Sequence, residues 1–355
     1  MLNKNIYSIL RDILLLKDVI KLENFKSIEL FAGAGGLALG LHESGFNPQL
    51  LVEIDKYASE TLRLNKPDWN VLNTDIRAID LNSLNISQDI DLISGGAPCQ
   101  SFSYAGLRGG LEDTRGTLFY DFARFIDFFK PKVFLFENVK GLITHEGGHT
   151  INTIISTFEN LGYVVRWELL KAIHYEVAQK RERIIMIGVR KDIHDINGDF
   201  IYPKPQNKIL TLRDALVDVP ESIGASYPET KKKVLDLVPP GGYWRDLPVE
   251  VAKDYMGVSY YSGGGRTGMA RRISWDEPSL TLTTSPAQKQ TERCHPDETR
   301  PFTTREYARI QSFPDSWEFY GSLGNVYKQI GNAVPVNLAK HVGNSINKYL
   351  SKGIK

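Results

Sequence analysis

The chain has 355 residues, of which 42% are hydrophobic and 24% charged, and its formal net charge is +1. These values are ordinary for a globular protein with a sizeable core, and the balanced charge argues against a histone-like nucleic-acid binder but not against an enzyme with a local basic cleft. No run approaches the roughly 18 consecutive apolar residues of a membrane-spanning helix. The two cysteines, Cys99 and Cys294, give no disulfide framework, which favours a cytoplasmic protein.

Residues 1–26 are predicted to form an N-terminal helical extension, because apolar residues recur there at helical spacing between charges. Further along, short apolar segments alternate with amphipathic ones. The predicted strands are residues 27–31, 48–55, 70–76, 90–98, 131–139 and 181–190, and the predicted helices are residues 37–45, 56–66, 116–130 and 150–161. This alternation predicts an α/β domain over residues 27–190, with a parallel sheet covered by helices on both sides.

The composition changes near residue 191. Residues 191–299 carry many prolines and glycines with mixed charges, and they are predicted to form a smaller, irregular, β-rich domain. A helix is predicted over residues 303–313, within a hinge of residues 300–326 that closes the small domain. Residues 327–355 end in a helix that is expected to return to the first domain.

The glycine-rich turn "GAGGLA", residues 33–38, lies between a predicted strand and a predicted helix and fits the dinucleotide-binding pattern G-x-G-x-x-G/A. Glu53 ends the second strand, where a carboxylate can accept both ribose hydroxyl protons, and Asp75 ends the third, where it could accept from an adenine amino group. The pattern alone does not separate NAD from S-adenosylmethionine, although Phe31 departs from the usual V-x-G-x-G form and favours the latter. A tight turn with an incidental acid downstream is the alternative.

Cys99 follows the fourth predicted strand in a turn of glycine, alanine and proline that would expose its thiol. Glu137 ends the next strand, and Arg181 and Arg183 come just before another. A nucleophile, an acid and cations are therefore expected on one rim of the sheet, as covalent catalysis on an electron-poor ring requires. A nearby arginine would also favour the thiolate. The alternative is an inert structural cysteine.

The ordered motifs resemble those of the cytosine-C5 DNA methyltransferases of bacterial restriction–modification systems. "FAGAGG", "GGAPCQSFS", "ENV" and "QKRER" resemble the family's first motif, cysteine loop, glutamate motif and Q-x-R-x-R motif, while "RPFTTREYARIQSFP" and "QIGNAVPV" resemble its two closing motifs. The resemblance implies a Rossmann-like catalytic domain that binds S-adenosylmethionine over residues 27–190, and a target-recognition domain over residues 191–299. Ala97 replaces the first of two prolines usual in the family, from which altered loop rigidity rather than lost activity is expected.

This resemblance implies methyl transfer from S-adenosylmethionine to C5 of a cytosine flipped out of double-stranded DNA, with S-adenosylhomocysteine as product and no metal. Cys99 would add to C6, Glu137 would hold N3 and the exocyclic amine, and Arg181 would contact O2 with the support of Arg183. The implied cofactor-binding residues are Phe31, Ala32, Gly33, Gly35, Glu53, Ile54, Asp75, Ile76, Pro98, Leu118, Asn332 and Val334.

Two segments are expected to contact DNA. Residues 100–117 resemble the family's mobile catalytic loop, and residues 260–275 combine glycines with arginines that could read guanine or anchor phosphate. Thr281 resembles the threonine of the family's Thr-Leu pair, which positions the DNA backbone. The predicted DNA-binding residues are Gln100, Ser103, Arg108, Arg115, Arg266, Arg271, Arg272 and Thr281. Solvated loop charges are the alternative.

Other classes remain open. A tRNA cytosine-C5 methyltransferase would share the fold and Cys99, but the long recognition region suits duplex DNA better. A nicotinamide-dependent oxidoreductase would leave Cys99, Glu137 and Arg181 without a role, and a non-catalytic DNA-binding protein would leave Cys99 and Glu137 unexplained. The expected enzyme is a monomer whose partners are double-stranded DNA and a separately encoded restriction endonuclease. Zinc is not expected, because Cys294 and His295 lack a second pair of ligands.

Overall fold

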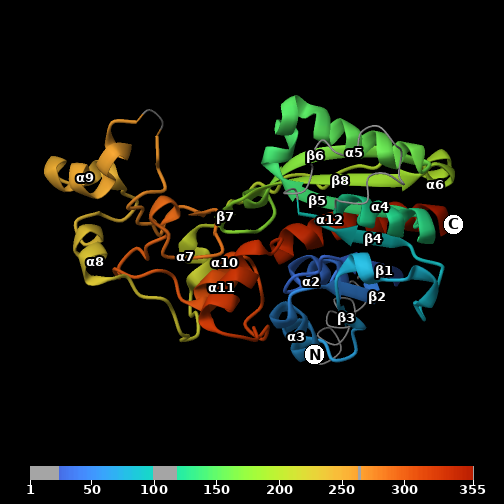
Figure 1. Ribbon diagram of the computed structural model, residues 1–355, viewed down its shortest axis with the longest axis horizontal. Coiled ribbons are helices and arrows are strands. Elements are labelled where there is room, and N and C mark those ends of the chain that lie inside the picture. Colours follow the sequence, from blue (N-terminus) through green and yellow to red (C-terminus); the bar gives the residue numbers. More distant parts are fainter. Residues whose placement is uncertain (1–23, 99–117, 263–264, 355) are drawn as a thin grey trace, which may run out of the picture.

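A mixed sheet of seven strands dominates the larger part of the molecule (Figure 1). The computed structural model describes residues 24–98, 118–262 and 265–354. The sheet has the order β3-β2-β1-β4-β5-β8-β6. Six of its strands run in the same direction, and β8 runs in the opposite direction between β5 and β6. Its strands are β1 (Phe25–Leu30), β2 (Phe46–Glu53), β3 (Val71–Asn73), β4 (Leu92–Gly95), β5 (Val133–Val139), β6 (Tyr163–Lys171) and β8 (Glu182–Arg190). The predicted α/β class with a mostly parallel sheet is confirmed, and β6 is a strand that the sequence reading missed.

Helices cover both faces of this sheet. On one face, α4 (Leu118–Phe129) and α5 (His149–Asn160) pack against the central strands through a cluster of buried aromatic rings. Phe158 of α5 lies with its ring centroid 4.1 Å from that of Phe134 on β5 and 5.4 Å from that of Phe119 on α4. The near-continuous apolar sequence of β5 is explained by this burial on both faces, which is typical of central parallel strands.

The opposite face carries α2 (Gly36–His42) and the last long helix, α12 (Val336–Leu350). The two helices approach closely because small residues line their contact: a Cβ atom at Gly40 would lie only 2.4 Å from the carbonyl oxygen of Val336. Ser44, just after α2, donates to the carbonyl of Lys340 at 2.9 Å and accepts from Asn347 Nδ2 through its own carbonyl at 3.0 Å. The end of the chain is thereby fixed against the first helix of the sheet domain. Two further helices flank the sheet, α3 (Lys56–Asn65) and α6 (Lys191–Asn197).

The strand order creates the position of the site. It reverses between β1 and β4, and in open α/β sheets ligands bind outside the carboxyl ends of the strands at such a switch point. Because β8 is antiparallel, its amino-terminal end lies at this same edge. The register pairs Val139, at the end of β5, with Arg183, near the start of β8. Residues that are far apart in the sequence therefore meet at one edge.

The smaller part of the molecule is irregular, and the prediction that it is β-rich is wrong. The described part of residues 191–299 contains α6, three further short α-helices, three 3-10 turns and one two-residue strand, β9 (Ser279–Leu280), which pairs with β7 (Gln179–Lys180). The further helices are α7 (Leu212–Leu216), α8 (Glu229–Leu235) and α9 (Val249–Met256). Pro228 and Pro248 directly precede α8 and α9, a position where proline starts a helix rather than interrupting a strand.

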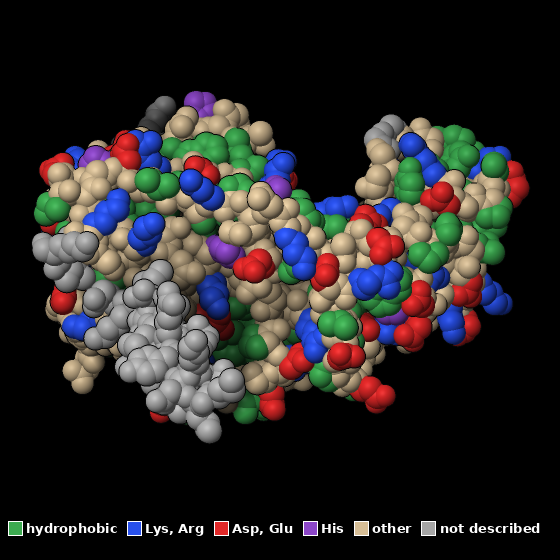
Figure 2. Space-filling view, turned by 180° about the vertical axis from the view of Figure 1, so that it is seen from behind, with side chains coloured by type: hydrophobic (Ala, Val, Ile, Leu, Met, Phe, Trp, Pro, Cys, Tyr) green, Lys and Arg blue, Asp and Glu red, His purple; other side chains and the backbone are tan. Residues whose placement is uncertain are grey.

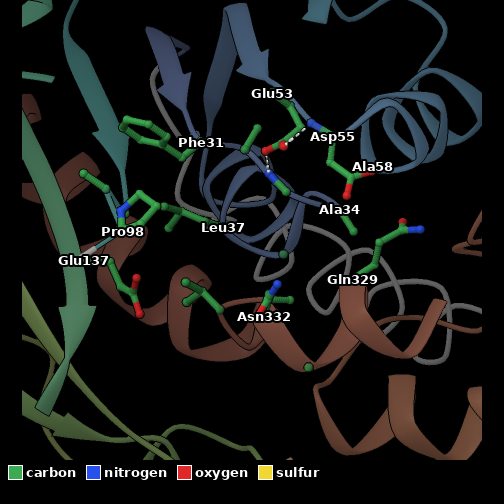
Figure 3. A pocket seen from close by; sticks show the side chains of 18 of the residues that line it. Phe31, Ala34, Leu37, Glu53, Asp55, Ala58, Pro98, Glu137, Gln329 and Asn332 are labelled. Atoms are coloured by element: carbon green, nitrogen blue, oxygen red, sulfur yellow. Dashed lines mark hydrogen bonds between the residues drawn. The ribbon is translucent and has the colours of Figure 1, made fainter. Parts of the chain in front are cut away.

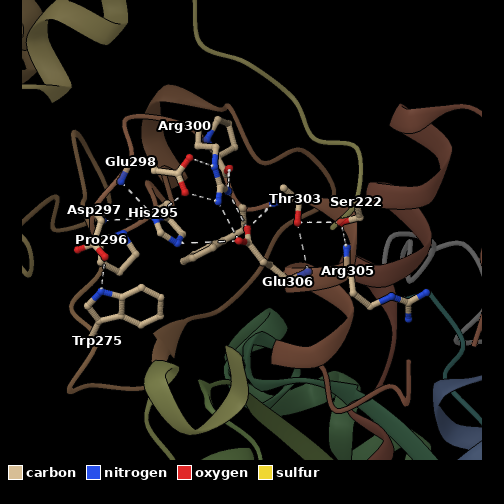
Figure 4. Close-up of polar contacts among 12 residues, drawn as sticks. Ser222, Trp275, His295, Pro296, Asp297, Glu298, Arg300, Thr303, Arg305 and Glu306 are labelled. Carbon is tan, nitrogen blue, oxygen red and sulfur yellow. Dashed lines mark hydrogen bonds and ion pairs between the residues drawn. The ribbon is translucent and has the colours of Figure 1, made fainter. Parts of the chain in front are cut away.

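A polar network joins this smaller part to α10 (Thr304–Ile310), as Figure 4 shows. Arg300 binds Glu306 through two parallel hydrogen bonds of 2.8 and 2.9 Å, and the same carboxylate accepts from the backbone nitrogen of Thr303 in a capping box. Neighbouring His295 is buried, which lowers its pKa and favours the neutral ring. The helix α11 (Leu323–Asn332), missed from the sequence, then leads back to the sheet.

A broad indentation separates the part with α8 and α9 from the part with the sheet (Figure 2). Basic and acidic side chains are interspersed over the visible face of the smaller part, in keeping with the balanced charge of the chain. Among the helices of the described ranges, none is long and apolar enough to cross a membrane. The predicted division into domains stays a prediction, and β1 begins at Phe25, two residues before the predicted start of the first domain.

Candidate active site

A cavity of about 1210 Å³ lies at the carboxyl edge of the sheet (Figure 3). The glycine turn, the ends of β2, β4 and β5, the start of β8, residues 281–284 and residues 331–334 all contribute to its wall. All of the expected cofactor-binding residues except Gly35 line it. The Cβ position of Gly35 faces inward, 2.6 Å from Leu62 and 2.9 Å from the Trp317 ring, so only its backbone could contact a ligand, and that contact stays a prediction.

The glycine turn has a backbone that few other residues could adopt. Gly33 and Gly35 have φ angles of +54° and +88°, and Phe31 has +58°, which is strained for a side chain of this size. A Cβ atom at Gly33 would meet nothing within 4 Å, so the backbone of Gly33 is open to the cavity. Such an open, left-handed glycine allows a ligand to approach the main chain closely.

Glu53 holds the turn from the end of β2. One carboxylate oxygen accepts from the backbone nitrogen of Gly33 and the other from that of Asp55, each at 2.7 Å (Figure 3). Burial raises the pKa of Glu53 above its ordinary value. Each oxygen of an ionised carboxylate can accept a second hydrogen bond, so Glu53 can still bind a pair of hydroxyl groups. Next to it, Ile54 is 65% exposed although it is apolar, and it lines the cavity.

Asp75 lies in the cavity wall with its carboxylate already engaged. Both of its oxygens accept from the guanidinium of Arg77, and this ion pair lowers the pKa of Asp75 to about 2. Asp75 also caps the short helical turn Ile76–Ala78, which places Ile76 in the wall. A ligand amino group at Asp75 would therefore share the carboxylate with Arg77.

Glu137 and Arg183 form an ion pair across β5 and β8, with 2.7 Å between Oε1 and Nε and each side chain 13% exposed. A Cβ atom at Gly96 would lie 2.6 Å from the other oxygen of Glu137, so a larger residue there would displace this carboxylate. Asn138 donates to the carbonyl of Ala97 at 3.0 Å and thus fixes the chain just before Pro98, which lines the cavity. Cys99 follows directly. It lies outside the described residues, as do Gln100, Ser103, Arg108 and Arg115.

The two arginines of "QKRER" have different surroundings. Arg181 is 2% exposed, and its terminal nitrogens donate to the carbonyls of Leu282 and Gly331 at 3.3 and 3.0 Å. The structure pairs Arg183 with Glu137, whereas Arg181 ties two segments of backbone together. Both arginines line the cavity, so the contact of either one with the substrate stays a prediction. Burial lowers the pKa of Arg181 to about 9, so it remains charged at neutral pH.

Two predicted DNA-binding arginines lie inside the protein. Arg272 is 4% exposed, and its guanidinium donates to four backbone carbonyls and the Thr299 hydroxyl. Arg271 donates to the carbonyl of Gly241 at 2.7 Å and pairs with Glu277. All three guanidinium nitrogens of Arg272 are engaged inside the protein, which argues against base reading by Arg272 in this conformation. The Nε of Arg271 has no partner, so a DNA contact of Arg271 stays a prediction. Arg266 is exposed, and Thr281 lines the cavity.

Sequence reasoning missed Glu29, which is 3% exposed on β1 and lines the cavity. Burial raises its pKa to about 8, and the neighbouring charge of Glu53 adds to the rise. The one visible signal was an acid in an otherwise apolar strand, "SIELF".

The raised pKa of Glu29 predicts that stability falls as the pH rises. The folded protein keeps a proton on Glu29 that the unfolded chain loses between about pH 4.5 and pH 8, so the free energy of unfolding decreases across this window and levels off above it. Glu29→Gln, which stays neutral, is expected to match the wild type near pH 5 and to exceed it increasingly toward pH 8, by up to about 1.4 kcal/mol for each unit of pKa shift. Denaturant unfolding from pH 5 to 9 measures this, and parallel curves for the two proteins would contradict it.

The fold and the site define an α/β enzyme that binds a nucleotide-like cofactor at a glycine turn, with a carboxylate–arginine pair in the same cavity. The model of the family described as C-5 cytosine-specific DNA methylase matches residues 25–348. The chain belongs to this family and is a DNA cytosine-5-methyltransferase, so the resemblance inferred from the motifs is confirmed. Enzymes of this family generally use S-adenosylmethionine.

Known proteins are similar over nearly the whole chain. The Type II methyltransferase M.PspPI of Psychrobacter sp. (strain TA137) is 58% identical over 94% of this chain and 81% of its own length, and M.Sau96I of Staphylococcus aureus is 55% identical over 94% and 78%. The solved structure of S. pombe Dnmt2 methyltransferase superposes with a TM-score of 0.63 at 17% identity, covering 92% of this chain and 98% of that one, which shows the shared fold. Family membership does not support the alternatives of a tRNA methyltransferase, an oxidoreductase or a non-catalytic binder.

Proposed function

We propose that this enzyme is the modification methyltransferase of a restriction–modification system, which methylates C5 of a cytosine within a short specific sequence of double-stranded DNA. Three relatives that are 55 to 58% identical are each named Type II methyltransferases, which supports this role. The observation that carries the chemistry is the Glu137–Arg183 ion pair, because it lies in the cavity that the glycine turn and Pro98, the neighbour of Cys99, also line.

The residues of the cavity fit S-adenosylmethionine, which when bound supplies an electrophilic methyl group. Gly33 would let the cofactor approach the backbone, because nothing occupies the space beside it. Glu53 would accept from the ribose hydroxyls, and the exposed side chain of Ile54 would cover the face of the adenine. Phe31, Leu118 and the segment from Asn332 to Val334 would complete the wall. The proposed transfer uses no metal.

The proposed chemistry begins at Cys99. Cytosine C5 is a poor nucleophile until a thiolate adds to C6, and we assign this addition to the Cys99 sulfur. Glu137 would hold N3 and the exocyclic amine and supply the proton that makes C6 electrophilic. Arg183 would fix the carboxylate of Glu137 and take the O2 contact first expected of Arg181. After C5 has received the methyl group, its proton would pass to water, the C5–C6 double bond would re-form, the bond between sulfur and C6 would break to release the Cys99 thiolate, and the N3 proton would return to Glu137.

The target base lies within a duplex and has to leave the base stack to reach such a cavity. Thr281 in the cavity wall and the exposed Arg266 remain proposed DNA contacts. Gln100, Ser103, Arg108 and Arg115 are proposed contacts in the segment after Cys99. A protein that reads a site asymmetrically needs no two-fold partner, so we propose a monomer, acting in the cytoplasm beside a separately encoded restriction endonuclease.

Bisulfite sequencing of a plasmid of varied sequence tests this function. The plasmid is recovered from cells that express the wild type and from cells that express Cys99→Ser. Protection of one cytosine in a single short motif, present only with the wild type, is the expected result and also identifies the recognition site. Complete conversion of the plasmid by bisulfite, with protected cytosines in total tRNA instead, would overturn the proposal. The restriction–modification role predicts in addition that the protected motif becomes resistant to an endonuclease that cuts it.

A further inference from the structure

One wall of the cavity has no regular secondary structure of its own. Residues 281–284, here called the pocket loop, follow the two-residue strand β9 and line the cavity together with Glu137 and Arg183. Polar side chains from other segments hold the main chain of this loop. Gln179 accepts from the Leu282 nitrogen at 3.0 Å, and Tyr307 donates to the Thr283 carbonyl at 3.2 Å.

Arg293 makes the contact at the start of the pocket loop. Its Nε and one terminal nitrogen donate to the carbonyl of Thr281 at 3.2 and 2.9 Å, and its other terminal nitrogen donates to the carbonyl of Glu292 at 2.6 Å. The side chain is 5% exposed, and burial lowers its pKa to about 10, so a charged guanidinium is held inside the protein. Burying such a group has a high desolvation cost, which its hydrogen bonds must offset.

The backbone on either side of Arg293 is hydrogen-bonded to residues 268–271, not to the pocket loop. Glu292 donates its backbone nitrogen to the carbonyl of Gly268 at 2.9 Å, and Cys294 donates to the carbonyl of Arg271 at 3.0 Å. Residues 268–271 begin two positions after the exposed Arg266. Arg293 therefore connects the segment proposed to contact DNA, through its backbone neighbours, with the wall of the cavity, through its side chain.

We propose that Arg293 is a positioning residue for methyl transfer: by holding the Thr281 carbonyl it fixes the pocket loop, and with it the place of the flipped cytosine, relative to the DNA-contacting segment. This inference rests on the proposed function of the cavity. Arg293 itself need not touch DNA or cofactor. Because Thr281 is only one of several proposed DNA contacts, loss of Arg293 should slow the step that follows DNA binding far more than it lowers the affinity for DNA.

Arg293→Lys tests this role, because lysine keeps the charge but cannot span the two carbonyls. The matched control is Arg272→Lys, which alters an equally buried arginine whose bonded carbonyls belong to Leu235, Val238, His295 and Pro296, none of them in the cavity wall. The turnover number and KM are measured with tritiated S-adenosylmethionine and unmethylated plasmid, together with the melting temperature and the Kd for S-adenosylhomocysteine.

Both variants are expected to melt at a lower temperature than the wild type. Arg293→Lys is expected to lower kcat by about tenfold or more, with KM for DNA and the Kd for S-adenosylhomocysteine within about threefold, as a lost charge-assisted contact implies. Arg272→Lys is expected to keep its kcat. Equal kcat losses in both variants, or an unchanged kcat in Arg293→Lys, would overturn the positioning role. An inactive wild type would instead overturn the proposed function, so the two failures are distinguishable.

Discussion

Replacing Cys99 with serine is expected to lower methyl transfer to DNA by about a thousandfold or more, because a thiolate is the attacking group and a serine hydroxyl stays protonated near neutral pH. The folded structure and the affinity for S-adenosylhomocysteine should stay close to those of the wild type, since the substitution exchanges one atom of Cys99 and leaves the proposed cofactor residues, including the neighbouring Pro98, unchanged. Tritium transfer to plasmid DNA and isothermal titration with S-adenosylhomocysteine measure the two quantities. An equal loss of both would indicate a folding role for Cys99.

The second cysteine provides a matched control for this substitution. Cys294 is fully buried in the small core around Leu235 and Trp244, and burial raises the pKa of its thiol to about 11. Cys294→Ser should therefore reduce stability but retain transfer. DNA that carries 5-fluorocytosine at the target adds a direct test, because the fluorine cannot leave as a proton does. The wild type and Cys294→Ser should form a covalent adduct that survives denaturing electrophoresis, and Cys99→Ser should not.

The sheet and the glycine turn could be predicted from the sequence because each element carries its own local signal. The apolar run of β5 marks a strand buried on both faces, and the spacing from Gly33 to Glu53 places an acid at the end of the next strand. The strand β6 was missed, since its alternating charges, in "YVVRWELLK", conceal an edge strand. In such a strand one face packs on the sheet domain while the other meets water, so apolar residues alternate with charged ones and the continuous apolar run of a central strand is missing.

The sequence could not predict which of Arg181 and Arg183 forms the ion pair with Glu137. Both belong to "QKRER", and neither residue type nor spacing tells which one turns toward Glu137. That depends on the antiparallel register of β5 and β8, in which Val139 lies opposite Arg183. The surroundings of Arg271 and Arg272 could not be read from the sequence either. Arginines among glycines suggested a DNA contact, yet backbone carbonyls that become neighbours only after folding take up their donors.

Glu137→Gln is the second substitution with a large expected effect. Glutamine keeps the size of the side chain and can still hydrogen-bond N3 and the exocyclic amine, but it cannot transfer a proton to N3, so kcat is expected to fall by roughly 10² to 10⁴-fold. Binding of duplex DNA should remain measurable by gel shift, because phosphate contacts made elsewhere supply most of the affinity. Steady-state methyl transfer with saturating plasmid gives the change in kcat.

The loss has to be separated from the simple breaking of an ion pair, because Glu137→Gln also leaves Arg183 without its partner at 2.7 Å. Glu182→Gln provides the comparison: it makes the same substitution next to Arg183 and removes the 2.9 Å pair with Lys140, at a carboxylate outside the cavity wall. If the chemistry depends on Glu137, the Glu182 variant keeps its kcat within about twofold, as is usual for an exposed ion pair. Wild-type turnover in Glu137→Gln would remove Glu137 from the mechanism. Equal losses in the two variants would mean that the rate depends on the negative charge around Arg183 and not on proton transfer to N3.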